Sequence, residues 1–287
     1  MAVYRRGYLR YEGELTGRLD RLLVLPRFAG QQILSQRLVT MVLVASMFWP
    51  LACAVYVYLA NRADLLAGFG GEEAAQFLVV DANFFIIFMN TQASFAIVLA
   101  ALAGPGLIAP DLSNGALPLY FSRPLSRTDY VVARMLVIVG LLSLVTWVPG
   151  VMLFIMQAGM AGWSWFAANW TMGAAIFFGF MLWALLVGLV ALASSAYVKW
   201  RIVGGALVLA VFFVLAGATE LVNAVLRVRW AAAFNPALAM NQIWRSMLGA
   251  EALPGPGALA SLMAIGLMVV LLLLVLERKL RPVQVVS

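Results

Sequence analysis

Long apolar runs alternate along the chain with short polar interruptions, and this pattern predicts a bundle of membrane-spanning helices. An apolar run of about 20 residues makes a helix long enough to cross the ~30 Å hydrocarbon core of a bilayer. The chain has six such runs, so the predicted fold class is an all-α polytopic membrane protein. We expect the spans at about 38–60, 83–104, 130–156, 165–196, 202–221 and 258–276.

The third and fourth of these spans come from one apolar stretch. No Asp, Glu, Lys or Arg occurs between Arg134 and Lys199. A single helix of that length would be about three times as long as the hydrocarbon core is thick. The stretch must therefore fold back, and the glycines and tryptophans of 157–165 suit a break at a membrane interface.

The first 37 residues form a basic leader with seven arginines and no early apolar run, so we expect no cleavable signal peptide. Four leucines between Leu15 and Leu23 share one helical face. They predict an amphipathic helix in the cytoplasmic interface that stops near Pro26. The alternative is a solvated leader that only fixes topology. We divide the chain into this segment (1–37), a six-helix transmembrane domain (38–276) and a cytoplasmic tail (277–287).

The segment 223–257, between the fifth and sixth spans, is rich in apolar and aromatic residues. It contains Asn235-Pro236 and ends in Pro254-Gly-Pro-Gly257, which are breaks between elements. We expect one or two short external helices that dip into the outer interface. The alternative is an ordinary surface helix packed on the bundle.

The distribution of charge predicts the orientation of the chain. Of the residues, 64% are hydrophobic and 11% charged, with 19 Lys and Arg against 12 Asp and Glu. With six spans both termini lie on one side, and 15 of the 19 basic residues fall on that side. Because basic residues concentrate in cytoplasmic segments, we expect both termini and the 109–134 loop in the cytoplasm. We expect no nucleic-acid partner, since the charge flanks apolar runs.

Most catalytic chemistry is excluded by residue types that the chain lacks. It has no histidine, and Cys53 is its only cysteine, so His-based catalysis and thiol metal clusters are excluded. A P-loop needs Gly-Lys, but Val198 precedes Lys199 and Arg278 precedes Lys279. Ser194-Ser195 has no base beside it and is interpreted as small-residue packing. We predict no catalytic, cofactor-binding or metal-binding residues in this chain, and no enzyme activity of its own.

Three polar residues of the second predicted span share a narrow sector of the helix: Asn83, Asn90 and Ser94. Polar groups at membrane depth face protein or water rather than lipid. The three residues either line a translocation path or form hydrogen bonds between helices during assembly.

The polar stretch from Ala109 to Arg134 interrupts the middle of the chain. Pro110, Gly115, Pro118 and Pro124 are expected to break regular structure there. The stretch also carries charges that the flanking runs lack: Asp111, Arg123, Arg127, Asp129 and Arg134.

This stretch resembles the cytoplasmic loop between spans two and three of ABC-2 type exporter permeases. That family shows an acidic residue, a Gly-Thr-like pair, leucines, Ser-Arg-Pro-hydrophobic-Ser-Arg, and a lysine where span three begins. The matching residues here are Asp111, Gly115-Ala116, Leu117, Leu119, Ser122-Arg123-Pro124-Leu125-Ser126-Arg127, Tyr130 and Arg134. The departures are Asp for Glu, Ala for Thr, and Arg for Lys.

The resemblance implies a permease subunit in a bacterial inner membrane that forms half of a translocation path. Its partners would be separate ATP-binding subunits, which carry ATP and Mg²⁺, a second permease copy or paralogue, and the lipid bilayer. The loop would be a coupling helix, with 111–120 facing the ATPase and 123–134 forming a hinge into span three. The implied ATPase-coupling residues are Asp111, Ser113, Asn114, Gly115, Ala116, Leu117, Leu119, Tyr120, Arg123 and Arg127. The alternatives are a non-transporting scaffold that recruits a cytoplasmic partner, or an ATP-independent channel or carrier.

Overall fold

The computed structural model describes residues 17–62, 78–116 and 126–279, without the side chains of 18–24 and 127. Every regular element in these residues is a helix, and six helical segments are long and apolar enough to cross a membrane. The prediction of an all-helical, multi-pass membrane protein is therefore confirmed. The elements are α1 (Arg18–Leu34), α2 (Arg37–Ala60), α5 (Ala82–Ala103), α6 (Pro105–Ser113), α8 (Arg127–Val145), α9 (Trp147–Ala161), α10 (Trp163–Tyr197), α11 (Arg201–Leu226), η1 (Trp230–Phe234), α12 (Pro236–Leu248) and α13 (Ala258–Lys279).

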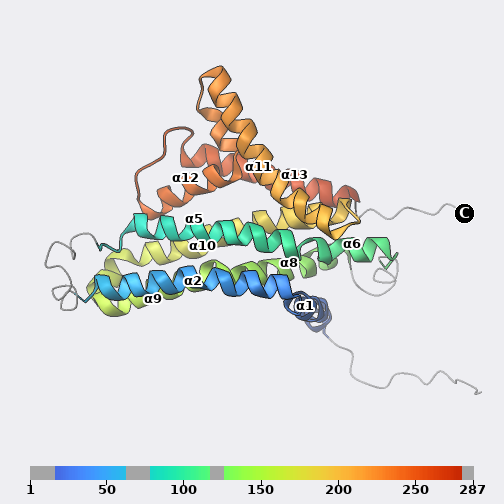
Figure 1. Ribbon diagram of the computed structural model, residues 1–287, viewed down its shortest axis with the longest axis horizontal. Helices are drawn as coiled ribbons and strands as arrows, with labels where there is room; N and C mark the ends of the chain where they lie inside the picture. Colours follow the sequence, from blue (N-terminus) through green and yellow to red (C-terminus); the bar gives the residue numbers. More distant parts are fainter. Residues whose placement is uncertain (1–16, 63–77, 117–125, 280–287) are drawn as a thin grey trace, which may run out of the picture.

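Helix α10 is the centre of the bundle. It is 35 residues long and contacts α5, α6, α8, α9, α11, α12 and α13. Helices α2, α5, α8, α9 and α10 run lengthwise side by side, whereas α11 leaves the bundle at an angle (Figure 1). In the most apolar 18-residue stretch of α10, 72% of the residues are buried, whereas the share is 22% in the corresponding stretches of α2, α11 and α13. The outer helices therefore expose their apolar side chains, as helices that face lipid or another subunit do.

Helix α1 lies across the others and is seen nearly end-on in Figure 1. It does not stop near Pro26 as predicted, because the helix continues through that residue to Leu34. Proline removes one backbone hydrogen bond from a helix interior. Burial of Ala29 and Ile33, together with the contact between α1 and α8, offsets this loss.

The third span is not one continuous helix. Helix α8 ends at Val145 and α9 begins at Trp147, with Thr146 in a non-helical conformation between them. Pro149 explains the break, because its ring clashes with the carbonyl of residue 145 and it has no N–H to donate to it. Helix α9 ends at Ala161, and the next residue, Gly162, has a φ of 91° that allows the chain to reverse within the predicted 157–165 segment.

The second span extends beyond its predicted end. Helix α5 passes through Gly104 directly into α6, which contains both Pro105 and Pro110 and ends at Ser113. The expectation that Pro110 breaks regular structure is therefore wrong, and the interruption begins at Asn114 rather than at Ala109. Pro105 occupies the first position of α6, where its missing N–H costs nothing.

The segment between α11 and α13 contains η1 and α12. Asn235 caps α12 by accepting hydrogen bonds from the backbone N–H groups of Ala237 (3.1 Å) and Leu238 (3.4 Å). Trp244 of α12 is buried against Phe180 and Trp183 of α10, with ring centroids 5.9 and 6.0 Å away. Since α10 spans 163–197, this contact lies at the middle of α10, and α12 is therefore packed into the bundle along its length.

Candidate functional site

The polar loop between the second and third spans starts from a tightly held helical joint at Gly104-Pro105. The buried Ser195 hydroxyl of α10 accepts hydrogen bonds from the backbone N–H groups of Ile108 and Ala109, both at 3.0 Å. It donates its own proton to the Pro105 carbonyl oxygen, also at 3.0 Å. One hydroxyl thus uses its full capacity of one donor and two acceptors. Ser195 is therefore a backbone anchor for α6, which corrects its interpretation as packing alone.

Helices α10 and α11 hold the same joint from two sides. A Cβ on Gly104 would lie 2.6 Å from Cβ of Ala191 in α10. A Cβ on Gly205 of α11 would lie 2.5 Å from the Ala101 carbonyl oxygen of α5. Both positions require glycine because any side chain would push the helices apart. The joint is therefore fixed by backbone contact as well as by hydrogen bonds.

Beyond the joint, three side chains that we name the charged clamp connect α6 to α8: Asp111, Tyr130 and Arg134. The Tyr130 hydroxyl donates to Asp111 Oδ2 at 2.6 Å, and the Arg134 guanidinium donates to the same oxygen and forms an ion pair with it. The guanidinium also lies 5.2 Å from the centre of the Tyr130 ring, a cation–π contact. Tyr130 is fully buried and the Arg134 side chain is 10% exposed, so the clamp lies within the protein.

The predicted coupling residues fall into three groups. Asp111 and Ser113 belong to α6, and Asn114, Gly115 and Ala116 follow it directly. Gly115 has a φ of 64°, and the Ala116 N–H donates to the Asp111 carbonyl oxygen. Arg127 is the first residue of α8, and Ser126 and Asp129 form a capping box at the start of this helix. The predicted residues that lie outside the described part of the chain are Leu117, Leu119, Tyr120 and Arg123.

A second polar cluster connects α5 to α12, and we name it the amide contact: Asn90, Asn241 and Arg245. The Asn241 side-chain amide donates to Asn90 Oδ1 at 2.7 Å. Arg245 Nε donates to Asn241 Oδ1 at 3.0 Å, and its Nη1 donates to the Glu251 carbonyl oxygen at 3.0 Å. Asn90 therefore forms a hydrogen bond between helices, which is one of the two roles expected for it, the other being to line a translocation path.

The other two residues of the predicted path do not join this contact. Ser94 donates to the carbonyl oxygen of Asn90 in its own helix, and Asn83 donates to Asp81, which caps α5. Both side chains are exposed in the single chain, on the same face as the exposed Ile87. A polar face on an apolar span is not expected to contact lipid. This face of α5 therefore suits either a water-filled path or a second subunit.

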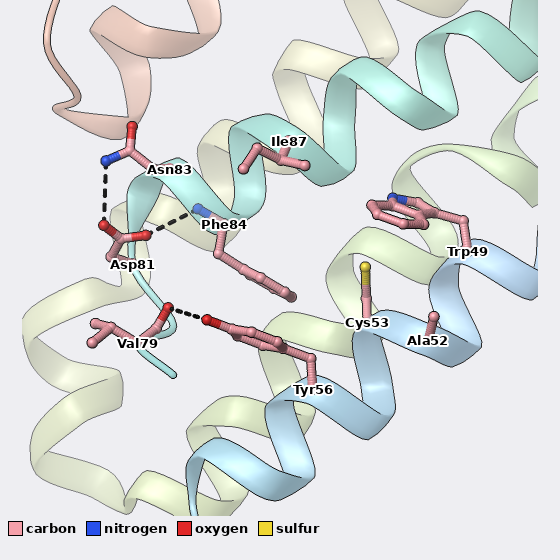
Figure 2. Close-up of a pocket in the computed structure, with 9 residues that line it drawn as sticks. All are labelled: Trp49, Ala52, Cys53, Tyr56, Val79, Asp81, Asn83, Phe84 and Ile87. Carbon is pink, nitrogen blue, oxygen red and sulfur yellow. Dashed lines mark hydrogen bonds between the residues drawn. The ribbon is translucent and has the colours of Figure 1, made fainter. Parts of the chain in front are cut away.

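A pocket of about 520 Å³ opens beside Asn83, between α2 and the start of α5 (Figure 2). Its walls are mainly apolar and aromatic, with Asp81 and Asn83 as polar groups at one end. The lining residues are Trp49, Ala52, Cys53, Tyr56, Val79, Asp81, Asn83, Phe84 and Ile87. An apolar cavity with polar groups at one end fits an amphipathic molecule.

Sequence reasoning missed Ser195, Asn241 and Arg245 as contact residues. Asn241 and Arg245 stand four residues apart on a helix, and that spacing could have suggested a polar face on α12. Ser195 had no such signal, because its partners lie about 90 residues away.

No protein-family model matches this chain, and no curated protein matches it. The resemblance carried by the 109–134 loop therefore rests on its sequence pattern.

Proposed function

We propose that this chain is the permease subunit of an ATP-driven transporter of the ABC-2 exporter type. In this proposal the chain forms half of a translocation path in a bacterial inner membrane. The segment between α6 and α8 receives movement from a separate ATP-binding subunit, since the chain has no P-loop of its own.

The observation that carries the proposal is the way in which this loop is built into the bundle. A segment that transmits force must not yield at its base. On one side the loop leaves α6, which Ser195 and the close contact with α11 hold in place. On the other side it enters α8 through a capping box, and the charged clamp binds the two sides together. Displacement of the loop would therefore move the second, third and fourth spans as one unit.

The exposed polar face of α5 supports the second half of the proposal. A single chain leaves Asn83 and Ser94 uncovered on a span that is otherwise apolar. A second permease copy opposite this face would enclose a path between two such surfaces. The pocket beside Asn83 gives that path mainly apolar walls, so the proposed cargo is an amphipathic or lipid-like molecule.

The orientation is part of the proposal. The ends of α6 and α10, the beginnings of α8 and α11, and the end of α13 lie at one end of the bundle, which we name the α6 end (Figure 1). Most of the basic residues in the described part of the chain lie there, including Arg37, Arg134, Lys199, Arg201 and Arg278. By the positive-inside rule, this concentration of basic residues supports the proposal that the α6 end faces the cytoplasm. The α12 segment then enters the bundle from the outer side.

The test replaces residues 115–122 with a Gly-Ser segment of equal length, so that Asp111 and α8 stay intact. We expect the variant to insert into the membrane and to unfold at the same temperature as the unchanged chain. When tagged protein is purified from its native membranes, the ATP-binding subunit that copurifies with the unchanged chain should be lost from the variant, as measured by mass spectrometry and ATP hydrolysis.

The matched control is an equal replacement of residues 66–73, which lie in the sequence between the end of α2 and the beginning of α5. This control should retain the ATP-binding subunit. Retention of a fully coupled ATPase by the 115–122 variant would contradict the proposal. If the unchanged chain brings down no ATP-binding protein, a scaffold becomes the better assignment.

A further inference from the structure

A second pocket lies at the α6 end of the bundle, and its lining is basic. It measures about 210 Å³, whereas one water molecule in the liquid takes ~30 Å³, so it can hold a group of several heavy atoms. Helix α1, the two ends of α6, the first turns of α8 and the α10–α11 turn form its walls. Its charged lining residues are Arg134, Lys199 and Arg201, and none of the described residues that line it is an Asp or a Glu.

Two of these basic groups have unused capacity to donate hydrogen bonds. The Arg134 residue is 8% exposed, and its Nε has no hydrogen-bond partner among the described residues. Asp111 accepts from the Nη2 atom of Arg134 and leaves Nε free. The Lys199 ammonium likewise bonds to no described residue, although it lines the pocket. A buried guanidinium N–H without an acceptor costs free energy unless a ligand supplies one.

Uncharged donors complete the site. Gln32 of α1 and Gln36, the residue just before α2, line the same pocket with their side-chain amides. Arg201 is held in place, because its guanidinium donates to the Gln36 side chain and to the Leu102 carbonyl oxygen. Several fixed donors around a small volume, with a net positive charge, match the oxygens of a phosphate group.

The position of the pocket along the bundle indicates where such a phosphate comes from. Lys199 lies in the turn between α10, which ends at Tyr197, and α11, which begins at Arg201. Both helices are long and apolar enough to span a membrane, so their turn lies at the membrane edge. Phospholipid headgroups occupy this depth, and basic pockets between spans at this level bind anionic headgroups.

We propose that this pocket binds a phosphate group, and that its source is the headgroup of an anionic phospholipid. Arg134 and Lys199 hold the phosphate oxygens, and α1 closes the site from the side. This binding does not depend on the transport assignment. Because Arg134 belongs to both the pocket and the charged clamp, bound lipid stabilises the base of the loop and thereby makes the fold sensitive to membrane composition.

The test measures lipid binding by the full-length chain in detergent. Phosphatidylglycerol, phosphatidylcholine and soluble glycerol phosphate are added in separate arms, and retained lipid is counted by native mass spectrometry while the unfolding temperature is recorded. We expect phosphatidylglycerol to bind and to raise the unfolding temperature. Phosphatidylcholine, whose headgroup carries a compensating positive charge, should do so much less.

Two variants remove the site without disturbing the clamp. Lys199→Gln removes one free cation, and Gln32→Glu introduces a carboxylate into the pocket. Each should weaken phosphatidylglycerol binding about fivefold or more, since one basic side chain near an anionic headgroup is worth about that factor. The matched controls are Arg278→Gln, which removes an exposed charge at the same end, and Gln31→Glu, which adds a carboxylate to α1 beside the pocket. Both controls should bind like the unchanged chain.

The arms separate the two sources of phosphate. If glycerol phosphate alone reproduces the effect, and Lys199→Gln and Gln32→Glu weaken it, the site is still a phosphate site, with a soluble ligand. Equal binding of phosphatidylglycerol and phosphatidylcholine would overturn the proposal. So would phosphatidylglycerol binding that falls equally in the two site variants and in their controls.

Discussion

The two polar clusters of the bundle connect helices in physically different ways. The charged clamp joins α6 to α8 through an ion pair and a buried tyrosine, between two elements that are neighbours in sequence. The amide contact joins α5 to α12 through one neutral hydrogen bond between side chains that are 151 residues apart. Breaking one side of a buried ion pair leaves an uncompensated charge, whereas a broken amide pair can exchange to other partners.

This difference separates a fixed connection from one that can open. The clamp resists separation because leaving either the Asp111 carboxylate or the Arg134 guanidinium buried without the other costs free energy. The amide contact makes a small contribution to stability, so this hydrogen bond itself can open at low cost, although the buried Trp244 still holds α12 on α10. The proposed transport function would use both properties: a rigid base where force enters, and a contact that can reform in each cycle.

The largest expected effect comes from removing one side of the clamp. Arg134→Met leaves the Asp111 carboxylate buried without a cation, and we expect the unfolding free energy to fall by about 3–5 kcal/mol. The measurement is denaturant or thermal unfolding in detergent. Adding Asp111→Asn to this variant should restore much of the loss, because the unpaired charge is then gone. If Arg134→Met alone lowers the unfolding free energy by less than the double variant does, Asp111 and Arg134 do not stabilise each other.

An intermediate effect is expected at the joint beneath the clamp. Ser195→Ala removes the hydroxyl that accepts from Ile108 and Ala109, so we expect a loss of about 1–3 kcal/mol from unsatisfied buried groups. Hydrogen exchange at these two amides should rise as well. The control is Ser194→Ala, a neighbouring buried serine, which should leave exchange in α6 unchanged. Equal effects of the two substitutions would reduce Ser195 to a packing residue.

The smallest effect is expected at the amide contact. Asn90→Leu removes the acceptor for Asn241 and should lower the unfolding free energy by only about 0.5–1 kcal/mol, the usual size for a hydrogen bond between membrane helices. Asn83→Leu is the control on the same helix, since Asn83 bonds only to its own segment in the described residues. A loss at Asn90 as large as that at Arg134 would remove the distinction between the two clusters.

The sequence was sufficient to predict the features that depend on local composition. Apolar run length gave the six spans, and the uncharged stretch before Lys199 required a reversal, which Gly162 supplies. Features set by distant partners could not be predicted. Pro110 stays helical because α10 and α11 support α6, and α12 lies deep because Trp244 packs against Phe180. The candidate site was predicted in part. Asp111 and Arg134 were singled out as charged residues of the loop, but their pairing was not foreseen.

The charged clamp also has an evolutionary consequence. It fixes the distance between the end of α6 and the beginning of α8, so the two ends of the segment that connects them are already held together. The entropic cost of lengthening such a loop grows only slowly with its length. Residues 114–125, before the capping box of α8, are therefore expected to tolerate insertion, deletion or exchange with little effect on the bundle, so that the sequence of this segment can change in evolution independently of the membrane domain.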